Sequence, residues 1–468
     1  MPYDNSSLDS PDSWGTPKYD GSKDKELGLS NDLDQITTVH EGEQKFKQLG
    51  WQKLTICLIV EAIALGALSI PSAFATVGMV AGVLLSVGLG MVAIYTSYVV
   101  GQVKMKYPHV EHYADAVKLI WGRFGYELTG FMFALYLTLV VGSHTLTGTI
   151  AWITIVDKPA ICALVWGIVS AIILFFVALP PTFSEFAILG YIDFVSIIAA
   201  ILITIVATGI EASNAPGGLA AVTWSVWPPA GVTFGDAFLS VTNIIFAYSF
   251  AVCQYSFMAE MHTPRDYVKS IWALGLIEIL IYTLTGALIY AFVGENVGSP
   301  ALLSASSTVS RIAFGIALPV IFISGSINTT VTARYILGRA FENSPIKYIN
   351  TKAGWLTWVG LVAVITLIAW VVAEAIPFFS DLLGICSALF VSGFSFYFPA
   401  LFWFGLIKEG KWYHGWKNIC LSIVNALVFV IGITTLGCGT YAAVQDIVSE
   451  YASGSVRGAF SCDSSGYT

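Results

Sequence analysis

Eleven long apolar runs occupy most of this 468-residue chain, and they constrain its fold more than any other feature. Each run has about twenty residues or more, the length that an α-helix needs to cross a hydrocarbon core of ~30 Å. None alternates in the manner of a lipid-facing β-strand. The expected spans cover residues 54–74, 77–101, 127–153, 160–180, 187–209, 235–259, 270–293, 311–337, 355–373, 378–405 and 418–443. The sequence therefore predicts an all-α polytopic membrane protein with eleven transmembrane helices.

The composition excludes most other classes of protein. Apolar residues make up 56% of the chain and charged residues 11%, whereas soluble domains are about one-quarter charged. The net charge of −8 argues against a nucleic-acid partner, which needs a basic face. No protease, lipase or nucleotide-binding motif is present, so we expect no enzymatic activity, no metal and no cofactor. Of the seven cysteines, only Cys462 lies in a polar tail, and it has no obvious partner.

The distribution of basic residues predicts the topology. Residues 1–50 are polar and predict a disordered cytoplasmic tail. With this tail inside, nineteen of the 22 Lys and Arg residues fall on the cytoplasmic side of eleven spans, and only Lys158, Arg311 and Arg457 fall outside. Such an excess is the positive-inside signal. We therefore expect a transmembrane domain over residues 51–445 and an extracytoplasmic tail over 446–468.

Two spans carry features of interrupted helices. The first has Gly66 and Pro71 near its middle, and the sixth has a polar group around Tyr248 and Ser249. Alone, each feature has a simpler interpretation, a proline kink or an interhelical hydrogen-bond patch. Together they lie five helices apart, the spacing of inverted repeats whose broken helices meet at the membrane midplane. The repeats would cover residues 51–210 and 235–405, with an extra helix over 418–443.

Three segments resemble a known family. The run from Ala64 to Phe74 is similar to the first-helix signature of the amino acid/auxin permease (AAAP) family. The stretches 107–125 and 246–264 resemble its cytoplasmic loop after the second helix and its sixth helix, which ends in a Met-x-x-Pro pattern. The resemblance covers residues 45–445 and is strongest to the fungal neutral amino acid permeases of the methyltryptophan-resistance type. It implies the five-plus-five inverted-repeat fold of the amino acid–polyamine–organocation superfamily and secondary active transport. Ala64 stands where the family often has glycine.

The two interrupted segments define the expected substrate site. Free N–H groups of the first span would bind a substrate carboxylate, and carbonyls of the sixth span would bind its ammonium group. Polar residues of spans 3 and 8 would complete the walls. No charged residue lies in the break of span 6, which favours neutral substrate side chains. The candidate substrate-binding residues are Ala64, Leu65, Gly66, Ala67, Phe246, Ala247, Tyr248, Ser249, His144 and Asn328, with Tyr136, Ser143 and Ser324 as further wall residues.

Ionisable residues within spans are candidates for ion coupling because they are costly to place in lipid. Glu61 adjoins the expected break in the first span, and Asp193 lies in the fifth. Both are candidates for proton coupling, with Glu278 and His144 as weaker ones. For each of them a structural hydrogen bond is the alternative role. Hydroxyl groups of Ser324, Ser326 and Thr329 could instead supply oxygen ligands for sodium.

The sequence thus predicts a transporter that imports neutral aliphatic and aromatic L-amino acids by alternating access. The coupling ion is expected to be the proton, with sodium as the alternative. An amino-acid-sensing transceptor of the same fold is the alternative function. The protein is expected in the plasma membrane, with the vacuolar membrane as the alternative, and with the lipid bilayer as its surroundings.

Overall fold

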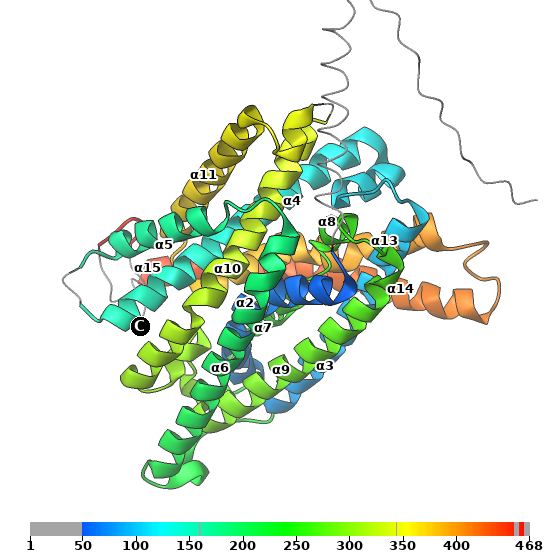
Figure 1. Cartoon of the computed structure of the whole chain (residues 1–468). Coiled ribbons are helices and arrows are strands. Elements are labelled where there is room, and N and C mark those ends of the chain that lie inside the picture. The colour runs from blue at the N-terminus through cyan, green and yellow to red at the C-terminus, as the bar shows by residue number, and fades with distance from the viewer. Residues whose placement is uncertain (1–48, 159–160, 343, 454–457, 463–468) are drawn as a thin grey trace, which may run out of the picture.

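Helices account for nearly all the regular structure in this computed structural model (Figure 1), which describes residues 49–158, 161–342, 344–453 and 458–462. The tail expected over residues 1–50 lies outside this part, apart from its last two residues. The α-helices are α2 (Trp51–Val77), α3 (Met79–Lys106), α4 (Tyr113–Val156), α5 (Ala163–Val177), α6 (Phe183–Asn214), α7 (Phe234–Ala247), α8 (Gln254–Ala259), α9 (Tyr267–Val293), α10 (Ser307–Ala340), α11 (Lys352–Ala375), α12 (Phe379–Cys386), α13 (Phe398–Phe402), α14 (Trp416–Thr434) and α15 (Thr440–Ser453).

Three π-helical segments join the last helices into two long spans. They are η6 (Ser387–Tyr397) and η7 (Trp403–Ile407), which flank α13, and η8 (Thr435–Gly439), which joins α14 to α15. The short 3₁₀ turns in the connections are η1 (Gly218–Ala221), η2 (Pro264–Asp266), η3 (Gly294–Asn296), η4 (Ala301–Ser304) and η5 (Pro345–Tyr348).

The spans agree with the apolar runs. Among the described residues, nine helical segments are long and apolar enough to cross a membrane, and the shorter apolar helices α5 and α7 occupy the expected spans 4 and 6. Two boundaries differ from expectation. α4 begins at Tyr113 because Gly122, with φ 62°, lets an amphipathic segment join span 3 at a kink. The last span continues to Ser453, into the segment expected to be tail.

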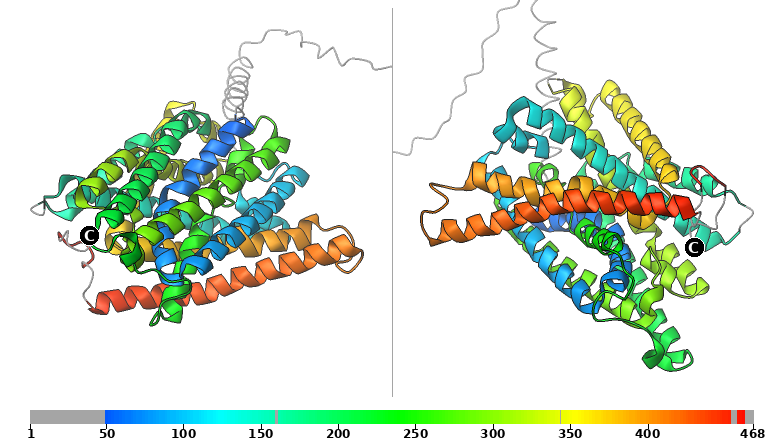
Figure 2. Two further views of the ribbon diagram at one scale, coloured as in Figure 1. Left: turned by 90° about the horizontal axis from the view of Figure 1, so that it is seen from below. Right: turned by 180° about the vertical axis from the view of Figure 1, so that it is seen from behind.

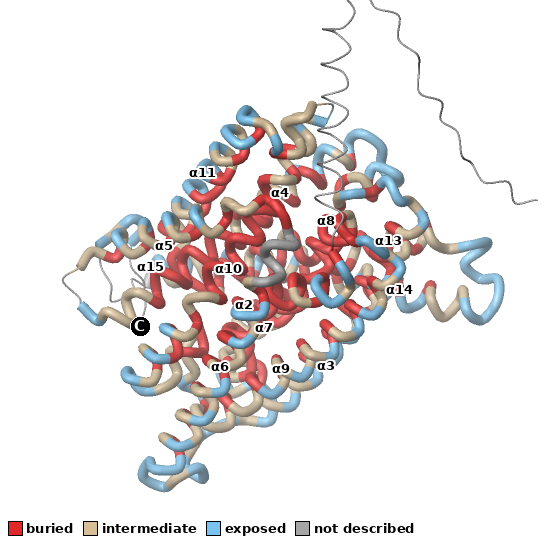
Figure 3. The backbone as a smooth tube through the Cα atoms, viewed as in Figure 1, coloured by how far each residue is buried: buried red, intermediate tan, exposed pale blue. Residues whose placement is uncertain are grey.

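The first span lies at the centre of the bundle. In α2, 94% of the most apolar 18-residue stretch is buried, against 28% in the final span formed by α14, η8 and α15. Helices α6, α7, α9 and α10 pack around α2, and buried backbone gathers in the middle of the molecule (Figure 3). The final span runs along the edge of the bundle (Figure 2). Its exposed apolar side chains therefore face the position of the lipid.

The expected break in the first span is wrong for this conformation. α2 is one unbroken helix that contains Pro71. Each N–H of an α-helix bonds a carbonyl four residues earlier, so Ala64 to Ala67 offer no free donors here. The close packing of neighbours on Gly66 restrains the helix, and surrounding helices commonly make a proline tolerable within a membrane span.

The expected break in the sixth span is present. α7 ends at Ala247, and α8 begins only at Gln254. The chain between them turns through bonds from the Tyr248 N–H to the Ile245 carbonyl (3.1 Å) and from the Ser249 N–H to the Phe246 carbonyl (3.1 Å). These short-range bonds satisfy backbone groups that would otherwise be orphaned in a buried helix end.

Backbone and side-chain contacts close the end of the bundle that the basic residues predict to face the cytoplasm. The Leu49 N–H donates to the Glu260 carbonyl (2.9 Å), and the His262 N–H donates to the Leu49 carbonyl (3.0 Å). The carboxylate of Glu260 also pairs with Arg334 of α10. These contacts join the segment before α2, the chain after α8 and α10 across one end of the bundle.

His112 lies beside this closure, at the start of α4. Its Nδ1 lies 3.1 Å from the Ser256 hydroxyl, and its ring packs edge-on against Tyr335. Burial, the largest cause, lowers the pKa of His112 to about 4, against the raising effect of the neighbouring Asp115 and Glu111 carboxylates. Arg334 and Lys347 also lower it. His112 is therefore neutral at pH 7.

A disulfide bond ties the end of the described chain to the bundle. Cys162, just before α5, pairs with Cys462, so the expectation of an unpaired Cys462 is wrong. The two residues are 300 positions apart, which is why spacing alone did not suggest the pair. Nearby, the Phe460 N–H donates to the Glu374 carbonyl (3.3 Å), and the Phe460 ring packs edge-on against Trp370. The tail thereby covers the ends of α5 and α11.

Candidate functional site

The two segments expected to form the site meet at the centre of the molecule. A Cβ placed on Gly66 of α2 would lie 2.9 Å from both Cα and Cβ of Ala247, the last residue of α7. It would lie 3.0 Å from the hydroxyl of Tyr282 in α9. Only glycine permits this approach, so the junction between α2 and α7 depends on the absence of a side chain at position 66.

The Tyr282 hydroxyl joins the two helices at this junction. Its oxygen lies 3.0 Å from the Ala62 carbonyl of α2 and 3.1 Å from the Ala247 carbonyl at the end of α7. A hydroxyl has one proton to donate, so the two carbonyls share it. The bridge satisfies the Ala247 carbonyl, one of the C-terminal groups that α7 leaves without a helical partner.

Two acidic side chains are buried next to the junction. The Cys253 thiol, in the turn before α8, lies 3.9 Å from Oε1 of Glu61. Oε2 of Glu61 and both carboxyl oxygens of Glu278 in α9 have no hydrogen-bond partner among the described residues. The two carboxyl groups lie close enough to interact electrostatically, and neither is ion-paired in the described part of the chain. A buried carboxyl group without a paired cation is costly to ionise, which makes both side chains candidates for carrying a proton.

Aromatic residues form most of the surrounding wall. The rings of Tyr248 and Tyr282 pack edge-on with centroids 5.1 Å apart. Tyr136 of α4 is fully buried against Phe390, and its hydroxyl lies near Ser249 and Glu61 without a close hydrogen bond. Unpartnered hydroxyls among rings suit a ligand that has a few polar groups and an apolar body.

His144 and Asn328 form a second cluster, between α4 and α10. His144 Nε2 lies 3.3 Å from the Ser324 hydroxyl, and the Asn328 amide donates to the Ser324 carbonyl (3.2 Å). Asn328 Oδ1 and His144 Nδ1 have no partner among the described residues. Both side chains are fully buried and retain unused hydrogen-bonding capacity.

The hydroxyls considered for sodium already take part in hydrogen bonds. Ser326 donates to the Ile323 carbonyl (2.7 Å), and Thr329 donates to the Gly325 carbonyl (3.0 Å). Ser324 contacts His144, as described above. Asp193 lies apart from these residues on α6, fully buried, with neither carboxyl oxygen partnered within the described chain.

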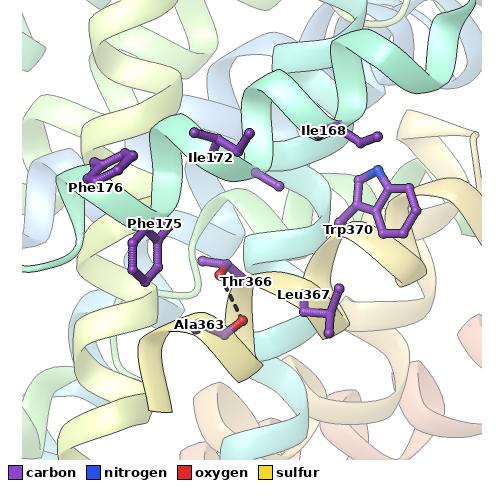
Figure 4. A pocket seen from close by; sticks show the side chains of 9 residues that line it. Ile168, Ile172, Phe175, Phe176, Ala363, Thr366, Leu367 and Trp370 are labelled. Carbon is purple, nitrogen blue, oxygen red and sulfur yellow. Dashed lines mark hydrogen bonds between the residues drawn. The ribbon is translucent and has the colours of Figure 1, made fainter. Parts of the chain in front are cut away.

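This conformation closes the junction to water. All ten candidate substrate-binding residues are buried. A hollow of about 580 Å³ does lie between α5 and α11 (Figure 4), but its lining is apolar. Its polar member, Thr366, donates to its own helix at the Val362 (2.9 Å) and Ala363 (3.1 Å) carbonyls. That hollow has no converging polar groups and does not suit a charged ligand.

The sequence did not single out Tyr282 or Cys253. A tyrosine or cysteine inside an apolar span has many packing roles, and only the three-dimensional contacts distinguish these two. The sequence also missed a group of acids at the opposite end of the bundle from Leu49. There, carboxylate oxygens of Asp381, Asp446 and Glu450 lie within 4.8 Å of one another.

Residues 47–445 match the model of a protein family described as transmembrane amino acid transporter protein. A protein of Neurospora crassa named N amino acid transport system protein is 59% identical over 95% of this chain and 96% of its own length. Amino acid permease 2 of Arabidopsis thaliana is 23% identical over 83% of this chain and 86% of its own length. These relatives are named as transporters or permeases, not as enzymes.

Two solved structures resemble this one. One is Mhp1, a nucleobase-cation-symport-1 family transporter in a closed conformation with bromovinylhydantoin bound, at a TM-score of 0.55 and 13% identity over 86% of this chain and 94% of that one. The other is MhsT in complex with L-phenylalanine, at a TM-score of 0.55 and 13% identity over 85% of this chain and 98% of that one. They confirm the inverted-repeat transporter fold expected from the sequence. The count of eleven spans stays a prediction.

Proposed function

This chain belongs to the family of transmembrane amino acid transporter proteins, and we propose that it imports neutral L-amino acids by alternating access, driven by protons. The contact between Gly66 and Ala247, with a protonatable acid pair beside it, carries the proposal. At this buried contact the broken span of α7 and α8, the unbroken central helix α2 and the ionisable Glu61 side chain come together.

The chemistry of the junction supports a neutral substrate. Carbonyl oxygens at the end of α7, including Phe246 and Ala247, suit an ammonium group. The surrounding rings of Tyr136 and Tyr248 and the neutral residues beside them suit an apolar side chain. A cationic or acidic substrate side chain would need a compensating charge, and residues 247–254 at the break of the sixth span carry none. The Neurospora crassa relative is named as an amino acid transport system protein, which supports an amino acid as the substrate.

Opening of α2 would expose the binding groups for the substrate carboxylate. In the closed structure the N–H groups of Ala64 to Ala67 lie within a continuous helix. Pro71 lacks a donor for the carbonyl of Ala67, so this helix is weakest there. We propose that substrate binding accompanies a local opening of α2 near Gly66. The residues proposed to bind substrate are those at positions 64–67 and 246–249, together with His144 and Asn328 of the second cluster.

Glu61 is proposed as the principal proton carrier. It lies on α2 and contacts the turn between α7 and α8 through Cys253. Movement of α2 against this turn would change its solvation, and therefore its affinity for a proton. Asp193 is the second candidate, because its buried carboxyl has no cation to neutralise it in the described chain.

Transport into proteoliposomes under imposed ion gradients tests the proposal. We expect labelled leucine or phenylalanine to accumulate when the interior is alkaline, without sodium. Arginine and glutamate should be taken up poorly. Glu61→Gln should exchange substrate across the membrane but not concentrate it, and Glu278→Gln provides the matched neutralisation of its neighbour. Accumulation that requires sodium and ignores the pH gradient would refute proton coupling, and saturable binding without flux would indicate a sensor.

Two independent features support the proposed orientation. The distribution of basic residues favours a cytoplasmic N-terminus. The pair Cys162–Cys462 lies on the opposite side, and disulfide bonds persist in oxidising compartments rather than the cytosol. We therefore propose a cytoplasmic N-terminus and an extracellular C-terminus in the plasma membrane. In the vacuolar membrane, the face that carries the C-terminus would point into the lumen. Surface biotinylation of intact cells therefore distinguishes the two locations.

A further inference from the structure

A polar hollow opens on the side of the bundle, away from the central junction. It has a volume of about 650 Å³ and lies between α3, the end of η7 and the start of α14. We call it the α3–α14 groove. The Asn425 amide of α14 donates to the Tyr95 hydroxyl of α3 at 2.5 Å, which joins the two helices at the floor of the groove. α3 also packs against α13 and η7.

The mouth of the groove is basic. Lys408 and Lys417 line it, together with Gln102, Asn418 and one acid, Glu409. Neither lysine forms an ion pair within the part of the chain that the structure describes. No carboxylate of the described chain therefore competes with an anion for these ammonium groups, and Lys408 otherwise lies over the Phe404 ring, 5.8 Å from its centroid.

Hydrogen bonds hold the connecting loop in place as one wall of the groove. The Asn418 amide donates to the carbonyls of Glu409 (2.9 Å) and Lys411 (3.4 Å). Beside the groove, the Lys106 ammonium of α3 donates to the Leu406 carbonyl of η7 at 2.7 Å. The groove is thus formed by fixed parts of the structure rather than by side chains alone.

Exposed aromatic residues place this mouth at the level of the lipid headgroups. Trp412, Tyr413 and Trp416 in the same connection are 56%, 52% and 81% exposed. Large aromatic side chains with polar tips favour the membrane–water interface. The connection also lies on the side that the basic residues identify as cytoplasmic, where the leaflet carries anionic lipids.

The groove also has an apolar lining. Val99 and Leu421 contribute aliphatic side chains to it, and Tyr98 and Trp403 contribute aromatic rings. A soluble anion would use only the basic mouth, whereas a phospholipid would use both parts. Basic pockets between transmembrane helices are suited to phosphorylated headgroups on the cytoplasmic side.

We propose that the α3–α14 groove binds the phosphate-bearing headgroup of an anionic phospholipid from the cytoplasmic leaflet, with the upper acyl chain against Val99 and Leu421. A lipid bound there would connect α3, the tenth span and the eleventh span. It would therefore stabilise the arrangement of helices seen in this structure, independently of which solute is transported.

The test uses the full-length protein in nanodiscs of phosphatidylcholine with and without phosphatidylserine or a phosphoinositide. Lipid binding is measured by native mass spectrometry and by the rise in unfolding temperature. The variant Lys408→Gln/Lys417→Gln removes two charges from the groove. The variant Arg123→Gln/Lys352→Gln removes two charges from exposed sites on the same side, as a matched control.

We expect the groove variant to bind anionic lipid roughly 25-fold more weakly, because each of the two basic residues near an anionic surface contributes about fivefold. The control should retain most of the affinity. Equal losses in the two variants, or none in the groove variant, would overturn the proposal. Stabilisation by millimolar inorganic phosphate in pure phosphatidylcholine, equal to that by the lipid, would show a site for free phosphate and overturn the lipid assignment.

Discussion

The close approach of α2 and α7 makes the substitution Gly66→Ala a sharp test of the junction. The added Cβ would lie 2.9 Å from the Cα and Cβ of Ala247, whereas carbon atoms normally pack at about 3.5–4.0 Å. One of the two clashing atoms is backbone, so a side-chain rotation cannot relieve the contact. One helix must move relative to the other.

The expected magnitude follows from comparison with a second glycine. Overpacking a buried site costs about 1–3 kcal/mol. Gly→Ala also returns about 0.5–1 kcal/mol of helix propensity. Gly360→Ala in α11 provides only this second effect, because nothing lies within 4 Å of its added Cβ. The difference between the two variants isolates the clash. The clash should raise the open fraction, the share of molecules in which α2 and α7 have separated, roughly 5- to 150-fold.

Thiol labelling can measure this open fraction. Cys253 is fully buried at the junction, so a maleimide reaches it only when the site opens. In a protein whose other free cysteines are replaced by serine, we expect Gly66→Ala to accelerate labelling of Cys253 by the factor above. Gly360→Ala should leave the rate within about twofold. Ala247→Gly should slow labelling of the Gly66→Ala protein again, because it removes one of the clashing atoms.

Equal labelling rates of correctly folded Gly66→Ala and Gly360→Ala would contradict a clash at this contact. Such a result would mean that the two helices separate without cost or do not touch. Circular dichroism and size-exclusion chromatography exclude simple misfolding as the cause of faster labelling. Labelling that is fast but insensitive to Ala247→Gly would place the opening elsewhere than at this contact.

Three further predictions concern other contacts. Tyr282→Phe should lower the free energy of unfolding by about 0.5–1.5 kcal/mol, because it removes a buried hydroxyl bridge, whereas Tyr441→Phe at an exposed position should be neutral in the same thermal assay. Cys462→Ser, in a background without the five free cysteines, releases the Cys162 thiol from the disulfide, and this thiol should react on intact cells with a membrane-impermeant maleimide. Lack of labelling in a surface-exposed protein would contradict the orientation. His112 has a folded pKa of about 4 against about 6.5 when unfolded, so stability should fall as pH drops from 6.5 toward 4; at pH 5 the loss should be about 2 kcal/mol, absent in His112→Gln and retained in His414→Gln.

Much of the architecture was predictable because lipid imposes a simple rule. Every backbone polar group must be paired inside the hydrocarbon, so long apolar runs become helices. The boundary of span 3 was less predictable, because the kink at Gly122 depends on a single backbone angle. The extension of the last span to Ser453 was missed because its outer turns contain polar residues that resemble a tail.

The candidate site was predictable as a meeting of segments, but not in its detailed geometry. The contact between positions 66 and 247 follows from the repeat spacing and the small residues on each side. The continuity of α2 could not be read from Pro71, because packing by neighbouring helices decides whether a proline breaks a membrane helix. Tyr282 carried no signal of its own, because its role depends on two carbonyls from other helices.

The bond between Cys162 and Cys462 changes how this protein behaves when it is cut. All chain between these residues lies inside one covalent ring of 300 sequence steps. A protease that nicks any connection within the ring leaves the pieces attached, so a non-reducing gel shows full-length mass and a reducing gel shows two fragments. A nick before Cys162, as in the connection between α3 and α4, separates the fragments under either condition. The pair of gels therefore locates an accessible connection without sequencing.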